Sequence, residues 1–460
     1  MGPPAKRLSG LKTSTAGSNP VLPAPRKSTR STRGCFYSPA DFEYIHSDIY
    51  HKVISIIDQP SMEQANPLQT ERNAKILKTI VYYIGFISLG LAAASLGPTL
   101  LDLAENTKTQ VEEISILFTA RSLGYLISSL LIGRVYDRRP GHPIMAGVLF
   151  TMATMLALAP VIPILWILTL AMFLLGLGEG CLDVGTNALF FWVHRENVGP
   201  YMNGLHFFFG LGAFLSPVII AQVVYNTGDI TWAYWLLALC MLPAAIGLIF
   251  LPSPARPVIS ASKEERAKDY RLVFTACAFL FLYVGAEISY GGWVSSYTRA
   301  LDLADQATAA YLTAAFWGAL TLGRLLAVPI STRVSSTAIL VTSLLGCIAS
   351  VMVILFGQGS MTAIWIGTLG LGLSMAAIFP TTLTFVEQHI QITGQITSFF
   401  FVGSSLGGMT LPWLIGQLFG AKGPQWTIYI ILIDLVIAMG VFFLMNSYQP
   451  RSRLPVESKI

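Results

Sequence analysis

The sequence predicts an all-α integral membrane protein in which twelve transmembrane helices form two parallel six-helix repeats. Composition is the first observation, because 53% of the 460 residues are hydrophobic and 12% are charged, whereas soluble domains have roughly 25% charged residues. Apolar runs of membrane length recur about twelve times between Ile76 and Met445, and a spanning helix needs roughly 20 residues. The third observation is an internal repeat at an offset of 194 residues. Together they exclude a soluble enzyme and a barrel of short alternating strands.

The chain begins with a basic segment over residues 1–75, which is rich in Ser, Thr and Pro and has no acidic residue before Asp41. We predict a disordered cytoplasmic tail from this composition. Two alternatives stay open, a transit peptide and a true start at Met62. Six spans then fill 76–251, a polar cytoplasmic loop covers 252–270, six more spans fill 271–447, and a cytoplasmic tail covers 448–460. The spans are predicted at 76–101, 113–133, 143–163, 164–193, 201–226, 231–251, 271–297, 307–330, 337–357, 361–386, 394–417 and 426–447.

Lys and Arg are distributed unevenly between the loops on the two sides of the membrane. One set of loops holds ten of them, from Arg134 to Arg333, whereas the other holds only Lys108, Arg299 and Lys422. The positive-inside rule therefore predicts that both termini are cytoplasmic. Because the net charge of +5 lies mainly in loops and tails, it does not indicate a nucleic-acid partner. The five cysteines lack the paired spacing of a disulfide framework or a zinc site.

The internal repeat joins three separate helix pairs. Chance matches of small residues are common in apolar helices, but one shared offset is much less so. Each half has an even number of spans, so the halves cross the membrane in the same orientation, as in transporters that bind substrate near the midplane between two rocking halves. Thr119, Ala120 and Gly124 match Thr313, Ala314 and Gly318, residues 175–178 match 369–372, and Gly212 and Pro217 match Gly407 and Pro412 at an offset of 195.

Residues that break this repeat are the candidates for chemistry, because two halves that pack alike need not bind alike. An ionisable side chain inside a span costs at least roughly 2.5–3.5 kcal/mol on insertion scales, so each is a functional candidate by default. A structural ion pair or a side chain that snorkels to the interface is the alternative. In the repeat, Arg121 matches Ala315, Glu179 matches Leu373, Asp183 matches Ala377, and Glu287 matches Ala93.

The fourth span carries a polar stripe formed by Glu179, Asp183 and Asn187, which are four residues apart and share one helix face. Two carboxylates this close in a low dielectric do not both stay charged without a cation. We therefore predict that the pair of Glu179 and Asp183 either holds a proton or binds a metal ion such as sodium. The neighbouring glycines also suit close helix packing.

Further candidates lie in the fifth, seventh and eighth spans. His206 begins the fifth span and is placed to contact a sugar hydroxyl or to titrate, although a structural histidine fits equally well. In the seventh span, Glu287 lies among aromatic residues that include Tyr290 and Trp293, a combination frequent in sugar sites and also in packing stripes. Arg324 is expected to snorkel to the inner interface.

The loop after the second span reads Gly133-Arg-Val-Tyr-Asp137-Arg138-Arg139-Pro-Gly141. It resembles the Gly-x-x-x-Asp-Arg-x-Gly-Arg-Arg loop of the major facilitator superfamily, although its second glycine comes one residue late and the final basic pair is missing. The resemblance implies a gating loop that uses Gly133, Asp137 and Arg138. A plain positively charged turn is the alternative.

A narrower resemblance is to the fucose:proton symporter family and, within it, to the sodium-dependent glucose transporter group. It implies alternating access and uptake of a monosaccharide or similar polyol, driven by a proton or sodium ion. Asp183 matches the family's acid of the fourth span, and Asn187 matches the asparagine one turn later. The first span lacks the family's acid and Glu179 is an addition, so the coupling chemistry is expected at Glu179 and Asp183. The residues that carry the resemblance are 121–125, 182–187, 205–207, 211–213, Pro217, 283–291 and 379–381.

We therefore predict a secondary active transporter that takes up a hexose such as glucose, galactose or fucose with a proton or sodium ion. Asp183 and Glu179 would couple the ion, and the substrate would contact Asn187, His206, Glu287, Tyr290, Trp293 and Arg121.

Two other classes stay open: an exporter of drugs or amphiphiles, whose glycine-proline signature the fifth span lacks, and a membrane sensor that does not transport. Enzymatic motifs are missing from the loops. No cofactor beyond the coupling ion is expected. The expected partners are a sugar and the lipid bilayer, without nucleic acid, for a multi-pass monomer in the plasma membrane or a bacterial inner membrane.

Overall fold

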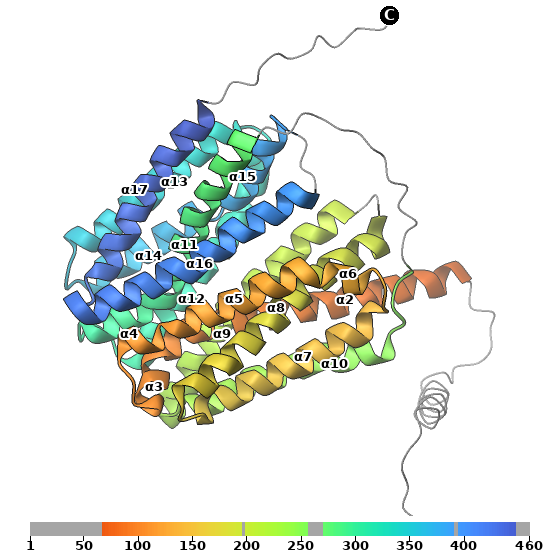
Figure 1. Cartoon of the computed structure of the whole chain (residues 1–460), viewed down its shortest axis with the longest axis horizontal. Coiled ribbons are helices and arrows are strands. Elements are labelled where there is room, and N and C mark those ends of the chain that lie inside the picture. Colours follow the sequence, from red (N-terminus) through yellow and green to blue (C-terminus); the bar gives the residue numbers. More distant parts are fainter. Residues whose placement is uncertain (1–66, 196–197, 256–269, 391–393, 448–460) are drawn as a thin grey trace, which may run out of the picture. The chain divides into compact units, whose positions relative to one another are not determined.

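The computed structural model describes residues 67–195, 198–255, 270–390 and 394–447. Residues 1–66 of the predicted N-terminal tail, the predicted C-terminal tail over 448–460 and most of the predicted central loop lie outside these residues. Within the described chain, twelve helical segments are long and apolar enough to cross a membrane, as the sequence predicts. Figure 1 shows the first six on one side and the last six on the other.

Each half of the chain contributes six spans, some of which are divided into shorter helices. The N-terminal half contains α2 (Pro67–Ala93), α3 (Leu96–Thr107), α4 (Val111–Ile114), α5 (Ile116–Leu131), α6 (Gly133–Tyr136), α7 (Gly141–Leu158), the 3-10 helix η1 (Ala159–Val161), α8 (Leu165–His194), α9 (Val198–Thr227) and α10 (Ile230–Phe250). The C-terminal half contains α11 (Tyr270–Ala300), α12 (Gln306–Ser331), α13 (Ser336–Phe356), α14 (Met361–Met375), α15 (Ile378–Glu387), α16 (Gly394–Lys422) and α17 (Trp426–Asn446).

Proline explains two of the breaks inside spans. Pro98 and Pro380 have no backbone N–H to donate to the carbonyls of Ala94 and Ala376, four residues earlier, and their rings clash with those carbonyls. The chain accordingly turns between α2 and α3 and between α14 and α15. Helix α2 begins at Pro67, inside the predicted 1–75 tail, because hydropathy marks only the apolar part of a helix whose first turns are polar.

The repeat seen in the sequence is also a repeat of packing. Gly212 of α9 lies so close to α2 that an added Cβ would overlap the Ile87 carbonyl oxygen, and Gly407 of α16 lies equally close to the Phe281 carbonyl oxygen of α11. Ile87 and Phe281 are separated by the same offset of 194 residues. Equivalent helices therefore pack through equivalent glycines in the two halves, because small residues allow close approach of membrane helices.

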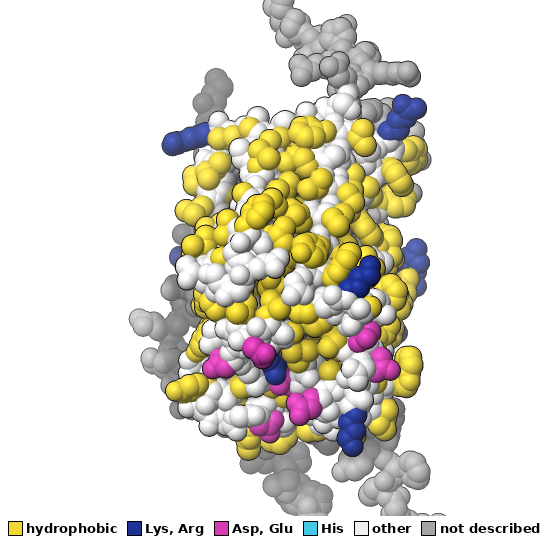
Figure 2. Space-filling view, turned by 90° about the vertical axis from the view of Figure 1, so that its left-hand side faces the viewer, with side chains coloured by type: hydrophobic (Ala, Val, Ile, Leu, Met, Phe, Trp, Pro, Cys, Tyr) yellow, Lys and Arg dark blue, Asp and Glu magenta, His cyan; other side chains and the backbone are white. Residues whose placement is uncertain are grey.

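The surface suits a lipid environment. Large hydrophobic side chains such as Trp166, Phe274 and Phe356 are three-quarters exposed. Figure 2 shows hydrophobic side chains across the middle of one face and acidic side chains gathered toward one end. Exposed apolar area on this scale is that of a multi-pass integral membrane protein.

The two halves contact each other mainly toward one end. We call the end of the helices where α2 begins and α17 ends the terminus side, and the opposite end the distal side. At the distal side Arg299 of α11 forms an ion pair with Asp102 of α3, at 2.8 and 3.2 Å. Nearer the middle of the spans, Thr119 and Ser122 of α5 donate to the carbonyl oxygens of Met409 and Gly408. The halves are therefore joined both at the distal side and near the middle of the spans.

Candidate functional site

Close packing of α5 against α8 brings two charged side chains together. An added Cβ on Gly176 of α8 would overlap the Arg121 carbonyl oxygen of α5. Glu179 follows one helical turn after Gly176, so its side chain lies on the same face. Arg121 donates through Nε to Glu179 Oε2 at 2.8 Å and through Nη2 to Oε1 at 2.5 Å. Its Nη1 donates to the Ala93 carbonyl oxygen at 3.1 Å, next to the break after α2.

One turn further along both helices, Asp183 has only neutral partners. The Tyr125 hydroxyl donates to Asp183 Oδ2 at 2.5 Å, and the Asn187 amide donates to Oδ1 at 2.8 Å and to the Asp183 carbonyl oxygen at 2.9 Å. The sequence predicts the stripe of Glu179, Asp183 and Asn187, and the structure places all three side chains in this region. It does not place the two carboxylates in equivalent surroundings, because Glu179 has a bidentate cation and Asp183 has none among the described residues.

A second charged pair lies in the C-terminal half. Arg324 of α12 places Nη2 3.6 Å from Glu287 Oε1 of α11. The expectation that Arg324 snorkels is therefore corrected, because its guanidinium is held beside a carboxylate within the bundle. The Tyr283 hydroxyl also lies beside Glu287 and donates to the Met375 carbonyl oxygen at 3.1 Å.

The two aromatic residues predicted to face a sugar are instead packed. Tyr290 is 1% exposed and its hydroxyl is 2.6 Å from the Thr368 hydroxyl. Trp293 is fully buried, donates to the Pro412 carbonyl oxygen at 3.0 Å and lies against Phe118. This placement is the packing alternative named above, and neither ring offers a free face in this conformation.

His206 of α9 remains exposed, although its helix packs against α2 and α12. Its ring meets Phe86 of α2 edge-on, with centroids 6.0 Å apart, and it feels the charge of Arg324 on α12. His206 therefore lies near helices of both halves. Sequence reasoning placed His206 near a substrate but did not connect it with Arg324.

The predicted gating loop contains a buried anchor that the motif does not indicate. Gly133 begins α6, and Asp137 and Arg138 follow it with exposed side chains. Tyr136, 1% exposed, donates to the Cys181 carbonyl oxygen of α8 at 2.9 Å. The loop is thus fixed to the helix that carries Asp183. The sequence shows Tyr136 as an aromatic residue just after a span, but it does not show which residue Tyr136 contacts.

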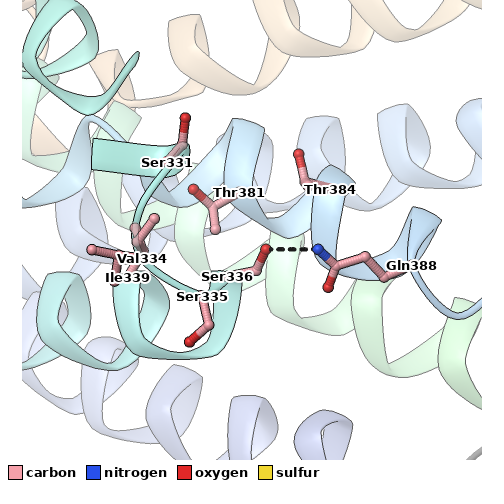
Figure 3. Close-up of a pocket in the computed structure, with 8 residues that line it drawn as sticks. All are labelled: Ser331, Val334, Ser335, Ser336, Ile339, Thr381, Thr384 and Gln388. Carbon is pink, nitrogen blue, oxygen red and sulfur yellow. Dashed lines mark hydrogen bonds between the residues drawn. The ribbon is translucent and has the colours of Figure 1, made fainter. Parts of the chain in front are cut away.

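Two further features bear on ligand binding. Within the described residues, no three His, Cys, Asp or Glu side chains cluster as metal ligands. A pocket of about 120 Å³ lies at the terminus side of the C-terminal half, and hydroxyl groups and Gln388 line it (Figure 3). Its lining includes a hydrogen bond of 3.3 Å from Gln388 to Ser336. None of the repeat-breaking charged residues lines this pocket, so it is separate from the charged site.

Twelve spans in two equivalent halves, with a charged pair inside each half, define a membrane transporter of the two-bundle class. The family model described as Major Facilitator Superfamily matches residues 82–412, and the chain belongs to this family. Membership confirms the predicted superfamily and a transporter in place of an enzyme.

Several proteins are similar along most of the chain. Sodium-dependent glucose transporter 1A of Mus musculus is 30% identical over 74% of this chain and 88% of its own length. Sodium-dependent glucose transporter 1 of Homo sapiens is 30% identical over 78% and 76%. Major facilitator superfamily domain-containing protein 4A of Pongo abelii is 27% identical over 75% and 87%.

Solved structures share the fold. The nucleoside transporter NupG superposes with a TM-score of 0.65 at 14% identity, covering 81% of this chain and 99% of its own. A bacterial homologue of the human lysosomal transporter Spinster, in an inward-facing and unoccupied conformation, gives a TM-score of 0.63 at 13% identity, covering 83% and 98%. At these identities the likeness concerns the fold alone.

Proposed function

We propose that the protein takes up a monosaccharide, a hexose such as glucose, galactose or fucose, together with a cation. The observation that carries this proposal is the difference between the two acids of α8. Arg121 neutralises Glu179, whereas Asp183 is held by Tyr125 and Asn187, which are both neutral. A carboxylate in a low dielectric requires a proton or a metal cation to balance its charge. The sugar-transporting relatives support a monosaccharide as the co-substrate.

The proposed orientation places the terminus side in the cytoplasm, following the distribution of Lys and Arg between the loops. The distal ion pair between Arg299 and Asp102 would then help to close the outer side. Rocking of the two halves would expose the region around Asp183 to either side in turn.

Both coupling ions fit the chemistry at Asp183. A proton on Oδ2 would turn the Tyr125 hydroxyl from donor to acceptor, so protonation would rearrange a contact between α5 and α8. A sodium ion would bind the carboxylate together with the Tyr125 oxygen and the amide oxygen of Asn187, after both side chains rotate. The acidic and neutral oxygen donors match the preference of hard cations.

The test is transport by purified protein in proteoliposomes. Uptake of radiolabelled glucose, galactose and fucose is measured with a sodium gradient, a proton gradient or neither. We expect one sugar to accumulate under one gradient, and Asp183→Asn to abolish accumulation while exchange of that sugar continues. Asp434→Asn is the matched control, because Asp434 is also a buried acid within a span, on α17.

Accumulation by Asp183→Asn with unchanged ion dependence would refute the coupling role. If the folded protein moves no sugar under any gradient, the monosaccharide proposal itself fails, and the exporter and the sensor become the readings to test.

A further inference from the structure

The inner end of the seam between α9 and α12 brings three polar groups of both halves together. Helix α9 belongs to the N-terminal half and α12 to the C-terminal half, and they run antiparallel. Contacts along this seam begin near the distal side and continue through small residues toward the terminus side. They end at His206 and Arg324, with Glu287 of α11 beside Arg324. The preceding contacts are Gln222 with Tyr311, Phe214 with Gly318, and Gly210 with Thr321.

The pair of Glu287 and Arg324 is incomplete by comparison with the pair on α5 and α8. Arg121 and Glu179 make two hydrogen bonds of 2.5 and 2.8 Å, whereas the shortest contact between Arg324 and Glu287 is 3.6 Å. The two side chains are therefore not hydrogen-bonded to each other, and the described neighbour of Glu287 besides Arg324 is the Tyr283 hydroxyl. A guanidinium has five N–H donors and a carboxylate about four acceptor sites. Charged groups within a membrane bundle that keep this much unused capacity are expected to bind a polar ligand.

Access to the pair is also retained. The side chains of Arg324 and Glu287 are 26% and 10% exposed, against 13% and 6% for Arg121 and Glu179. Glu287 lies 17 residues from the start of α11 and 13 from its end, so it is near the middle of the membrane. His206, on the other half, is exposed and lies close enough to Arg324 to feel its charge. A ligand at this point would contact both halves.

The donor and acceptor sites limit the chemistry of this ligand. A simple anion would meet the carboxylate of Glu287, and a simple cation would meet the guanidinium of Arg324. Two adjacent hydroxyl groups fit both, because each hydroxyl accepts from the guanidinium or donates to the carboxylate. We propose that Arg324 and Glu287 bind a vicinal pair of sugar hydroxyls, and that Arg324 is a residue that determines sugar specificity. This inference rests on the proposed monosaccharide transport.

The test compares deoxy sugars. For the sugar that wild type transports, the four analogues that lack one hydroxyl at carbons 2, 3, 4 or 6 are measured in counterflow, which needs no driving gradient. Wild type should bind two of these analogues more weakly than the parent sugar, and the hydroxyls that these two analogues lack should lie on adjacent carbons. Loss of a hydrogen bond to a charged group corresponds to roughly tenfold or more in affinity.

Arg324→Lys keeps the positive charge and removes the planar guanidinium with its paired donors, so it should raise the KM of the parent sugar about tenfold. The maximal rate should change less. The variant should also lose the preference of wild type for sugars that carry the same two hydroxyls. Glu287→Gln should act at the same pair and serves as the second variant if Arg324→Lys is not recovered folded. Arg333→Lys, in the exposed connection between α12 and α13, is the matched control and should leave both values unchanged.

The outcomes separate the two proposals. If wild type transports a sugar and both variants keep its KM and its deoxy-sugar profile, the assignment of Arg324 and Glu287 is wrong and the transport function stands. An unselective rise in KM for all analogues would overturn the hydroxyl-pair assignment. If wild type moves no sugar, the proposed function has failed first.

Discussion

Breaking the ion pair between Arg121 and Glu179 should destabilise the protein strongly, and removing both charges should restore most of the loss. In Glu179→Gln, Arg121 keeps its charge ten residues from either end of the span Val111–Leu131. Removal of one partner of a buried pair costs roughly 3–5 kcal/mol. Because the Arg121 side chain is 13% exposed, some water reaches it, and we expect about 3 kcal/mol, near the cost of an unpaired arginine on insertion scales.

A double-mutant cycle measures this coupling. Wild type, Arg121→Gln, Glu179→Gln and the double variant are unfolded by denaturant in the same detergent, and the four free energies of unfolding are compared. Both single variants should lose several kcal/mol, and the double variant should lose less than either, so the coupling energy should be larger than the loss in either single variant. Additive losses would show that the two side chains do not stabilise each other.

The same double variant tests the predicted role of Glu179 in ion coupling. If Glu179 serves the structure alone, the folded double variant should still accumulate sugar under the gradient that drives wild type. Loss of accumulation with retained exchange would instead return Glu179 to the coupling machinery beside Asp183.

Three further predictions concern packing and closure. Arg299→Gln removes the ion pair with Asp102 that joins the halves. A thiol reagent added from the distal side should then label a cysteine introduced in the central region faster than it labels the same cysteine in a protein that keeps Arg299. An unchanged labelling rate would contradict the closing role of this ion pair. Gly176→Ala should destabilise by at least about 1–3 kcal/mol, because its Cβ would overlap the Arg121 carbonyl oxygen, and denaturant unfolding measures the loss. Hydrogen bonds from Thr308 lower the pKa of the Asp305 carboxyl at the start of α12. The contribution of this cap to stability, at most roughly 1 kcal/mol, is therefore present above the ordinary pKa of about 4 and is lost as pH falls through the lower pKa of the folded state. The difference in unfolding free energy between wild type and Asp305→Ala should be larger at pH 7 than at pH 3.

The number of spans and the repeat were predictable because both depend on residue type along the chain. A run of about 20 apolar residues has few alternatives to a membrane helix. The offset that joins Gly212 to Gly407 reports a packing contact that both halves share. By contrast, the helical start at Pro67 was not predictable from hydropathy, because polar helical turns and polar tails have similar composition.

The partners of the charged residues were not predictable from the sequence, because they depend on helix crossings. Arg121 and Glu179 are 58 residues apart, and only the close approach at Gly176 brings them together. Trp293 shows the same limit for aromatic residues. A tryptophan suits a sugar site and a packed core equally well. Trp293 lies on the side of α11 that packs into the core, where it donates to the Pro412 carbonyl oxygen.

The distribution of ion pairs bears directly on rocking motion. Arg121 pairs with Glu179 inside the N-terminal half, and Arg324 lies beside Glu287 inside the C-terminal half. Because both pairs stay within one half, the halves can move apart without separating these charges in a low dielectric, which would cost several kcal/mol for each ion. Among the ion pairs of the described residues, the one that joins the halves is that of Arg299 and Asp102, and its side chains are 22% and 17% exposed, so water can replace the lost contact. The electrostatic cost of breaking this distal pair is therefore small, and a cation that neutralises Asp183 would remove the remaining buried charge of α8 before the halves move.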